Sequence, residues 1–155
     1  MEPPSIRTAT FGDLPSLMAI ERACFQQNQF SEALYISFLL RQEVEVYLST
    51  LEDEHIGSLV LEFPTGEPVC KVLSVAVSPD RQGLGYGTDL MSFAEERAGS
   101  MERGRIELEV RKNNLRARQL YRMLQYREIR VLRDFYGDGV DGVLCVKKLE
   151  PSPEQ

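Results

Sequence analysis

The spacing of hydrophobic and polar residues predicts a chain of short strands and helices. Apolar residues alternate with polar ones at Val44, Val46 and Leu48, which is the period of a half-buried strand. From Gly87 onward apolar residues instead recur every three or four positions, as on one face of a helix. The expected strands are Ile6–Thr10, Val44–Leu51, Ile56–Phe63, Val69–Val77, Arg105–Arg111, Tyr126–Tyr136 and Val140–Leu149.

The expected helices follow four apolar stripes. These are Leu14, Leu17, Met18 and Phe25 after Asp13 and Pro15; Leu34, Phe38 and Leu39 after Ser31–Glu32; Leu90, Met91, Ala94 and Ala98 within Gly87–Ala98; and Ala117, Leu120, Tyr121 and Leu124 after the capping residue Asn114.

The order of these elements predicts the fold class. Three antiparallel strands lead into the third helix, which forms a crossover to the strand at 105–111. This order is that of an α+β (mixed α/β) protein with a largely antiparallel sheet. We expect a single domain over residues 1–149 and a disordered tail at 150–155, because the end of the chain is polar and rich in proline.

A glycine-rich turn, Gln82-Gly83-Leu84-Gly85-Tyr86-Gly87, connects a buried strand to the third helix. Such a turn presents unpaired backbone N–H groups at the positive end of the helix dipole, so it favours an anion. A Walker phosphate loop is excluded because no Lys precedes Thr88. The dinucleotide fingerprint is excluded because the glycines are spaced by two. An ordinary glycine-rich turn remains the alternative.

The strand at 105–111 is apolar on one face and charged on the other. A strand inside a sheet covered by helices on both sides is expected to be apolar on both faces. The face that carries Glu107 and Glu109 is therefore either exposed to solvent or lines a cleft. A half-exposed strand with paired charges fits the pattern equally well.

Composition and charge narrow the class of protein. The net charge of −6 argues against a nucleic-acid-binding protein and is compatible with a cationic partner. Three widely spaced cysteines fit reduced thiols better than a disulfide framework or a metal site. No apolar run reaches membrane length, so we expect a cytoplasmic protein with no membrane partner.

The glycine-rich turn resembles the pyrophosphate loop of the Gcn5-related N-acetyltransferases (GNAT), Gln/Arg-x-x-Gly-x-Gly/Ala, at Gln82, Gly85 and Gly87. Further blocks resemble the RimI-type ribosomal-protein-alanine and protein N-terminal acetyltransferases of that superfamily. They are Ile6-Arg7-Thr8-Ala9-Thr10 with Asp13-Leu14, Leu108-Glu109-Val110-Arg111, Asn114 with Ala117 and Leu120-Tyr121, and Arg133-Asp134-Phe135-Tyr136 with Asp141-Gly142-Val143. The resemblance implies a sheet of about seven strands, splayed between the fourth and fifth, with about four helices.

The resemblance also implies where acetyl-CoA binds. Its pantetheine arm would pair with the backbone of the strand at 74–77, and its pyrophosphate would lie on the amides after it. The thioester carbonyl would be polarised by the amide of Val75 or Val77. The implied cofactor-binding residues are Val75, Ala76, Val77, Arg81, Gln82, Gly83, Leu84, Gly85, Tyr86, Gly87, Thr88, Asn114 and Tyr121.

The catalytic residues implied by the resemblance are Glu109 and Tyr121. Glu109 would accept a proton from the acceptor amine through a water, with Glu107 as the alternative base. Tyr121 would protonate the departing thiolate, although its place on an apolar stripe also fits core packing.

The implied substrate-binding residues are Phe30, Glu107, Phe135 and Tyr136, for whose aromatic members core packing is the alternative. Two departures from the family's pattern stand out. The segment at Asp80–Arg81 is shorter, which puts the role of Arg81 in question. Gln125-Tyr126 replaces Gly-Phe after the fourth helix, which puts the end of that helix in question.

We therefore expect an enzyme that transfers an acetyl group from acetyl-CoA to the α-amino group of a protein or peptide N-terminus, with a ribosomal protein as one candidate. The alternatives are acetylation of a small amine or a lysine side chain, and a non-catalytic acyl-CoA-binding module. A monomer or weak homodimer is expected.

Overall fold

The computed structural model describes residues 3–150. Its seven strands form one sheet in the order β1-β2-β3-β4-β5-β7-β6, and this confirms the predicted fold class. The strands are β1 (Ser5–Thr8), β2 (Val44–Leu51), β3 (Glu54–Glu62), β4 (Val69–Val77), β5 (Arg105–Arg111), β6 (Arg127–Leu132) and β7 (Gly142–Lys148). The helices are α1 (Leu14–Cys24), α2 (Glu32–Leu40), α3 (Tyr86–Ser100) and α4 (Leu115–Met123).

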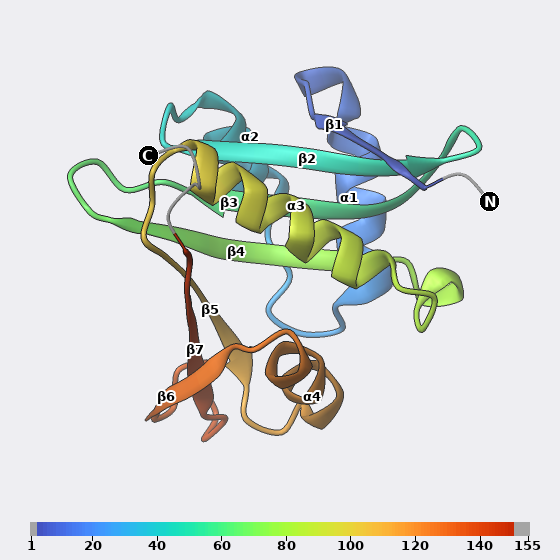
Figure 1. Ribbon diagram of the computed structural model, residues 1–155. Helices are drawn as coiled ribbons and strands as arrows, with labels where there is room; N and C mark the ends of the chain where they lie inside the picture. Colours follow the sequence, from blue (N-terminus) through green and yellow to red (C-terminus); the bar gives the residue numbers. More distant parts are fainter. Residues whose placement is uncertain (1–2, 151–155) are drawn as a thin grey trace.

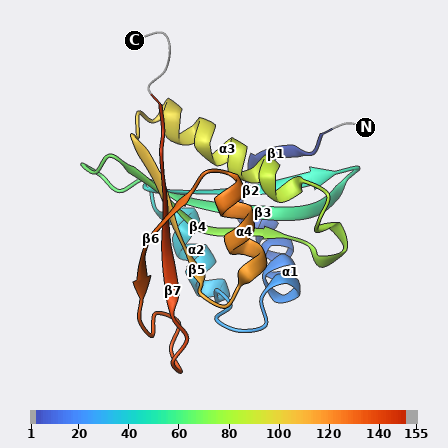
Figure 2. The same cartoon turned by 60° about the horizontal axis from the view of Figure 1, so that its bottom comes forward.

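The helices cover the two faces of the sheet unequally. In Figure 1, α3 crosses one face of β2, β3 and β4, while α1 and α2 lie on the opposite face. Figure 2 shows α4 beside β5, with the β6–β7 hairpin as a separate arm of the sheet. Two hydrophobic cores result, one beneath α3 and α4 and one beneath α1 and α2.

The third helix buries the predicted residues Leu90, Met91, Ala94 and Ala98. In α2, however, the prediction of Leu34 as an inward residue is wrong. Leu34 is exposed, and Tyr35 is fully buried beside Phe38. The α2 segment is apolar almost all round, so its sequence pattern did not distinguish the buried face.

The prediction of a long strand at Tyr126–Tyr136 is also wrong at its end, because β6 stops at Leu132 and a turn follows. Asp134 has a φ of +53°, and its backbone N–H donates to the Asp141 carboxylate at 2.9 Å. The neighbouring Tyr136 N–H donates to the carbonyl of Val140 at 3.1 Å, which delays the start of β7 to Gly142. These bonds fold Phe135 and Tyr136 out of the sheet ladder.

The fourth helix ends where the family pattern would have a glycine. Gln125 adopts a φ of +74°, the left-handed conformation that glycine favours after a helix. The Tyr126 N–H donates to the carbonyl of Tyr121 at 2.9 Å and so closes the helix. Of the predicted tail, residues 151–155 lie outside the described part of the chain, as do residues 1 and 2.

Candidate active site

The site is built around a split between β4 and β5. These two strands pair in parallel only from Val69–Arg105 to Val72–Leu108, although both continue beyond those residues. Figure 1 shows the two strands diverging from that point. Among residues 3–150, no strand therefore pairs with one edge of the later part of β4, and the backbone groups of that edge face the split.

A bulge in β4 lies where the strands begin to diverge. On β3, Leu61 pairs with Val72 and Val60 pairs with Ser74, so that Leu73 is an additional residue on β4. A bulge bends its strand and increases the local twist. This bend accounts for the divergence of β4 from its parallel neighbour.

The glycine-rich turn lies at the end of the free edge. Gly83 and Gly85 have φ values of +79° and +92°, a conformation that only glycine adopts readily. Gly85 caps α3 without any side-chain hydrogen bond, and the first bond within the helix is from Asp89 N–H to its carbonyl at 3.1 Å. The amides at positions 86–88 therefore have no acceptor within the helix and can donate to an anion.

A pocket of about 460 Å³ joins this turn to α4. It is lined by ten predicted residues, Val75, Val77, Arg81, Gln82, Gly83, Gly85, Gly87, Thr88, Asn114 and Tyr121. It is also lined by Met91, Arg116, Ala117 and Leu120, which were not predicted as cofactor-binding residues. Ala76 is buried in the core beneath α1 and α2, Tyr86 is buried, and the side chain of Leu84 projects into solvent.

The two arginines of this pocket differ in their pairing. Arg81 donates to the Glu54 carboxylate at 2.6 Å, so its charge is already partly compensated. Arg116 lies over the turn, because a Cβ added to Gly83 would be 3.4 Å from its Nη2. Within residues 3–150, no carboxylate pairs with Arg116. Arg116 lies in the first turn of α4, and no motif in the sequence predicted that it would line this pocket.

Asn114 has the capping role that the sequence predicted. Its side-chain oxygen accepts a hydrogen bond from the Ala117 N–H at 3.1 Å and thereby starts α4. Because Asn114 also lines the pocket, capping and cofactor contact are compatible.

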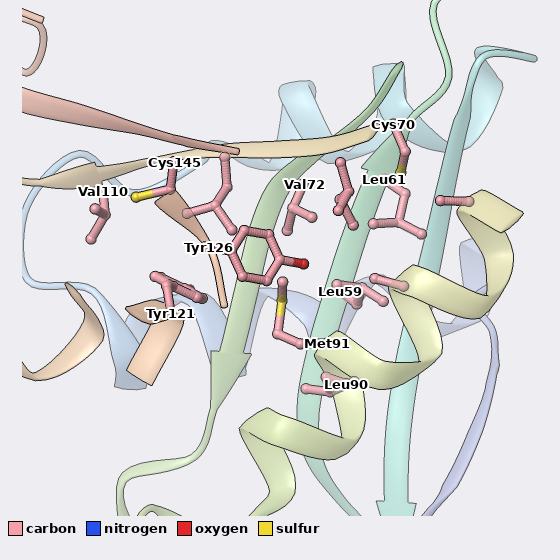
Figure 3. Packing of buried hydrophobic residues seen from close by; sticks show 14 of the residues in the cluster. Leu59, Leu61, Cys70, Val72, Leu90, Met91, Val110, Tyr121, Tyr126 and Cys145 are labelled. Atoms are coloured by element: carbon pink, nitrogen blue, oxygen red, sulfur yellow. The ribbon is translucent and has the colours of Figure 1, made fainter. Parts of the chain in front are cut away.

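Tyr121 reaches the pocket from the buried face of α4. It is only 7% exposed and packs edge-to-face on Tyr126, with ring centroids 5.9 Å apart. Figure 3 shows its ring beside Val110 and Cys145. Among the described residues no acceptor receives a hydrogen bond from its hydroxyl, and burial raises the pKa of that hydroxyl. Both of its predicted roles, packing and proton donation, are therefore sterically compatible.

Glu109 lies on the opposite face of the sheet. On β5, Ile106, Leu108 and Val110 point into the core beneath α3 and α4, so the carboxylates alternate toward the side of α1 and α2. Water still reaches Glu109, yet protein atoms crowd its carboxyl, and this desolvation is the main cause that raises its pKa. The negative charge of Glu107 raises it further, while Lys71 opposes the shift.

The predicted substrate-binding residues gather on this second face. Tyr136 lies close enough to Glu109 for that charge to raise its pKa, after burial as the main cause, to about 12. Phe135 contacts Tyr136 edge-to-face at 5.0 Å and is 51% exposed. Phe30 packs edge-to-face on Phe38 at 5.5 Å, so core packing is part of its role. The Glu107 carboxylate oxygen Oε2 lies 3.5 Å from Nε of Arg105.

The structure thus separates the predicted residues into two groups on either side of the split. The pocket with Tyr121 opens on the face covered by α3 and α4, while Glu109 and the aromatic residues lie on the face toward α1 and α2. Such an arrangement can bring two substrates together from opposite faces, with a carboxylate on one side and a tyrosine hydroxyl on the other.

Comparison with known proteins identifies the class. Residues 14–126 match the acetyltransferase (GNAT) family, and the chain belongs to that family. Over 92% of its length it is 29% identical to an uncharacterised N-acetyltransferase of Methanocaldococcus jannaschii, covering 90% of that protein. It is 27% identical to an N-alpha-acetyltransferase of Sulfurisphaera tokodaii, with 93% of this chain and 92% of the relative covered.

Solved structures share the fold. The ribosomal-protein-S18-alanine N-acetyltransferase from Escherichia coli superposes with a TM-score of 0.86 at 22% identity, over 98% of this chain and 97% of that one. The spermidine/spermine N-acetyltransferase from Vibrio cholerae superposes with a TM-score of 0.79 at 18% identity, over 94% and 92% of the two chains.

The protein is therefore an acetyl-CoA-dependent acetyltransferase. The residues present fit this co-substrate, because within the described chain a strand edge without a partner, helix-start amides without acceptors and an arginine without an acidic partner lie along one pocket. No helix of the described chain is long and apolar enough to span a membrane.

Proposed function

We propose that the enzyme acetylates the α-amino group of protein or peptide N-termini. The observation that carries this proposal is the split between β4 and β5, which has a pocket with Tyr121 on one face and the solvent-accessible carboxylate of Glu109 on the other. The name of the Sulfurisphaera relative, which matches nearly the whole chain, supports the same acceptor class.

The cofactor side binds and orients the acetyl donor. The free edge of β4 at residues 74–77 offers backbone groups to the pantetheine arm, in the manner of an added strand. The amides at 86–88 and the positive end of α3 hold the pyrophosphate. Arg116 adds a charge beside the same turn, a role for which it is better placed than the paired Arg81.

Glu109 serves as the proton acceptor for the attacking amine. Crowding by protein atoms, and then the charge of Glu107, raise the pKa of Glu109, which makes its carboxylate a stronger base than an ordinary glutamate. As the nitrogen forms its bond to the acetyl carbon, a proton passes from the nitrogen to Glu109 through a water. Glu107 forms an ion pair with Arg105, so we assign it a supporting electrostatic role.

Tyr121 serves as the proton donor for the leaving group. As the carbon–sulfur bond breaks, the electron pair stays on sulfur and the Tyr121 hydroxyl supplies the proton that yields the free thiol. Burial keeps this hydroxyl protonated at neutral pH because it raises the pKa. Transfer of a proton through solvent from Glu109 to Tyr121 then restores the enzyme.

The acceptor class follows from the proton that must be removed. A protein α-amino group has a reference pKa of roughly 7.7–8.0 and a lysine side chain one near 10.4. Freeing the α-amine at neutral pH is therefore easier by roughly 3 kcal/mol. A carboxylate base acting through water suits this lighter task.

The test uses purified protein, acetyl-CoA and two peptides, one with a free N-terminus and no lysine, the other with a blocked N-terminus and one lysine. We expect release of free coenzyme A, and a mass increase of one acetyl group, only with the first peptide. Glu109→Gln should lower kcat by about 10²–10⁴-fold, and Tyr121→Phe by a comparable factor.

Two matched variants control for indirect effects. Glu96→Gln changes an exposed carboxylate on α3, and Tyr126→Phe removes the hydroxyl of the tyrosine that packs on Tyr121. Both should keep the kcat of the unmodified protein. Full activity of Glu109→Gln would contradict its role as the base.

The fold itself favours a second candidate, because it is shared with an enzyme named for spermidine and spermine acetylation. Under that alternative the blocked lysine peptide or a polyamine would be acetylated faster than the free N-terminus. A non-catalytic acyl-CoA-binding module would bind coenzyme A in calorimetry without turnover on any of these acceptors.

A further inference from the structure

Three separate segments meet at the outer end of β5, next to Glu109. Arg111, the last residue of β5, donates a hydrogen bond to the side-chain oxygen of Asn28 in the loop between α1 and α2. The Asn28 amide in turn donates to the backbone carbonyl of Tyr136 at 3.4 Å. The Arg111 guanidinium lies 4.6 Å from the centre of the Tyr136 ring. We call this set of three residues the clasp.

The clasp depends on a glycine beneath the aromatic residues. Gly142 is the first residue of β7 and pairs with Arg111 across the strands, so its missing side chain would point to the same face. A Cβ at this position would be 3.2 Å from both Tyr136 Cε2 and Phe135 Cβ. Since Gly142 does not have a positive φ, space and not backbone conformation makes glycine necessary here.

The loop above Gly142 cannot easily move to make room. Asp134 accepts a hydrogen bond from the Gly139 N–H at 2.6 Å and donates its own N–H to Asp141 at 2.9 Å. The Lys112 N–H also donates to the carbonyl of Asp141 at 2.9 Å, which fixes the hairpin against the end of β5. An added methyl group therefore presses on the Tyr136 ring, which can rotate, and on the Cβ of Phe135, which the hydrogen-bonded loop restrains.

We propose that Gly142 is a positioning residue that, through the clasp, sets the place of the Tyr136 ring beside Glu109 and thereby the fit of the acceptor. This proposal rests on the proposed function, because it takes the Glu109 face to be the acceptor side. Gly142 contacts no reacting atom and acts only through Tyr136. The clasp joins the loop between α1 and α2 to the loop between β6 and β7 across the end of β5, and none of its three residues lines the pocket of Tyr121.

The test compares Gly142→Ala with Gly104→Ala, since a Cβ at Gly104 meets no atom within 4 Å. We expect Gly142→Ala to raise the KM for the free-N-terminus peptide about tenfold, because misplacement by roughly 1 Å can cost about 100-fold and a smaller shift is needed here. The KM for acetyl-CoA should stay unchanged. Gly104→Ala should alter neither KM.

A double-mutant cycle separates positioning from general damage. If Gly142 acts through Tyr136, then adding Gly142→Ala to Tyr136→Ala should have little further effect on the peptide KM. Additive effects in this cycle would overturn the proposal, as would an equal loss of acetyl-CoA binding.

A readout without turnover keeps this inference distinct from the proposed function. In protein labelled with ¹³C-tyrosine, the NMR signal of Tyr136 is assigned as the one that disappears in the Tyr136→Phe variant. We expect it to shift in Gly142→Ala and in Asn28→Ala but not in Gly104→Ala. An unshifted signal refutes the positioning role, whereas failure of the unmodified enzyme to acetylate any N-terminus refutes the proposed function alone.

Discussion

The buried carboxylate of Glu21 provides a quantitative test of how the acceptor side is held together. Glu21 on α1 is 2% exposed and accepts two hydrogen bonds, from the Phe30 N–H and from the Tyr35 hydroxyl, each at 2.8 Å. These bonds tie the end of the loop between α1 and α2 to the core. No motif or hydrophobic pattern in the sequence marks Glu21 for this role.

The size of the effect follows from the two donors. In Glu21→Ala the Phe30 N–H and the Tyr35 hydroxyl both lose their acceptor in a buried environment. Each unsatisfied group costs about 1–3 kcal/mol of stability. We therefore expect a loss of about 2–6 kcal/mol in the free energy of unfolding, a large share of the roughly 5–15 kcal/mol of a typical domain. In Glu21→Gln the amide oxygen can still accept from Phe30 N–H, and its NH₂ group can donate to the Tyr35 oxygen. That variant should lose only about 1 kcal/mol, because neutral hydrogen bonds replace charge-assisted ones.

The measurement is urea unfolding at 25 °C, followed by circular dichroism and extrapolated linearly to water. Gln26→Ala, at an exposed position of the same loop, is the matched control and should change stability by less than about 0.5 kcal/mol. A loosened loop should also raise the KM for the peptide while the affinity for coenzyme A is retained. The reasoning is refuted if the free energy of unfolding of Glu21→Ala lies within about 1 kcal/mol of that of the unmodified protein. It is also refuted if Glu21→Gln lowers that free energy as much as Glu21→Ala does.

Three further changes test other parts of the structure. Glu107→Gln removes a like charge that raises the pKa of Glu109. The acid limb of the kcat/KM profile should therefore move to lower pH. A shift to higher pH would contradict the assignment of Glu109 as the base. Gly85→Ala forces a residue with a Cβ into a φ of +92°, so calorimetry should record weaker binding of coenzyme A, whereas Gly99→Ala in α3 should bind it normally. Gln125→Gly relieves a φ of +74° and should raise the free energy of unfolding by about 0.5–1 kcal/mol, seen as a higher urea midpoint; a lower midpoint would show that Gln125 is not strained.

Local chemistry along the chain determined much of the fold and part of the site. Gly83 and Gly85 adopt the positive φ values that their turn required, and Asn114 caps α4, because these preferences depend only on near neighbours in sequence. The alternation at 105–111 likewise specified that both carboxylates share one face.

Tertiary structure decided which groups face one another. The extra residue at Leu73, which opens the split, leaves no mark on the apolar run of β4, because a bulge is defined by pairing with another strand. Tyr136 looked like part of a continuous strand, but a turn folds its ring onto Gly142, and Asn28, 108 positions away, donates to its carbonyl. Asn28 and Arg111 are 83 positions apart, and a contact over such a distance depends on the closed fold and not on any local preference. The sequence by itself therefore determined the elements and the chemistry they carry, while packing of the whole chain decided which face of the split each group serves.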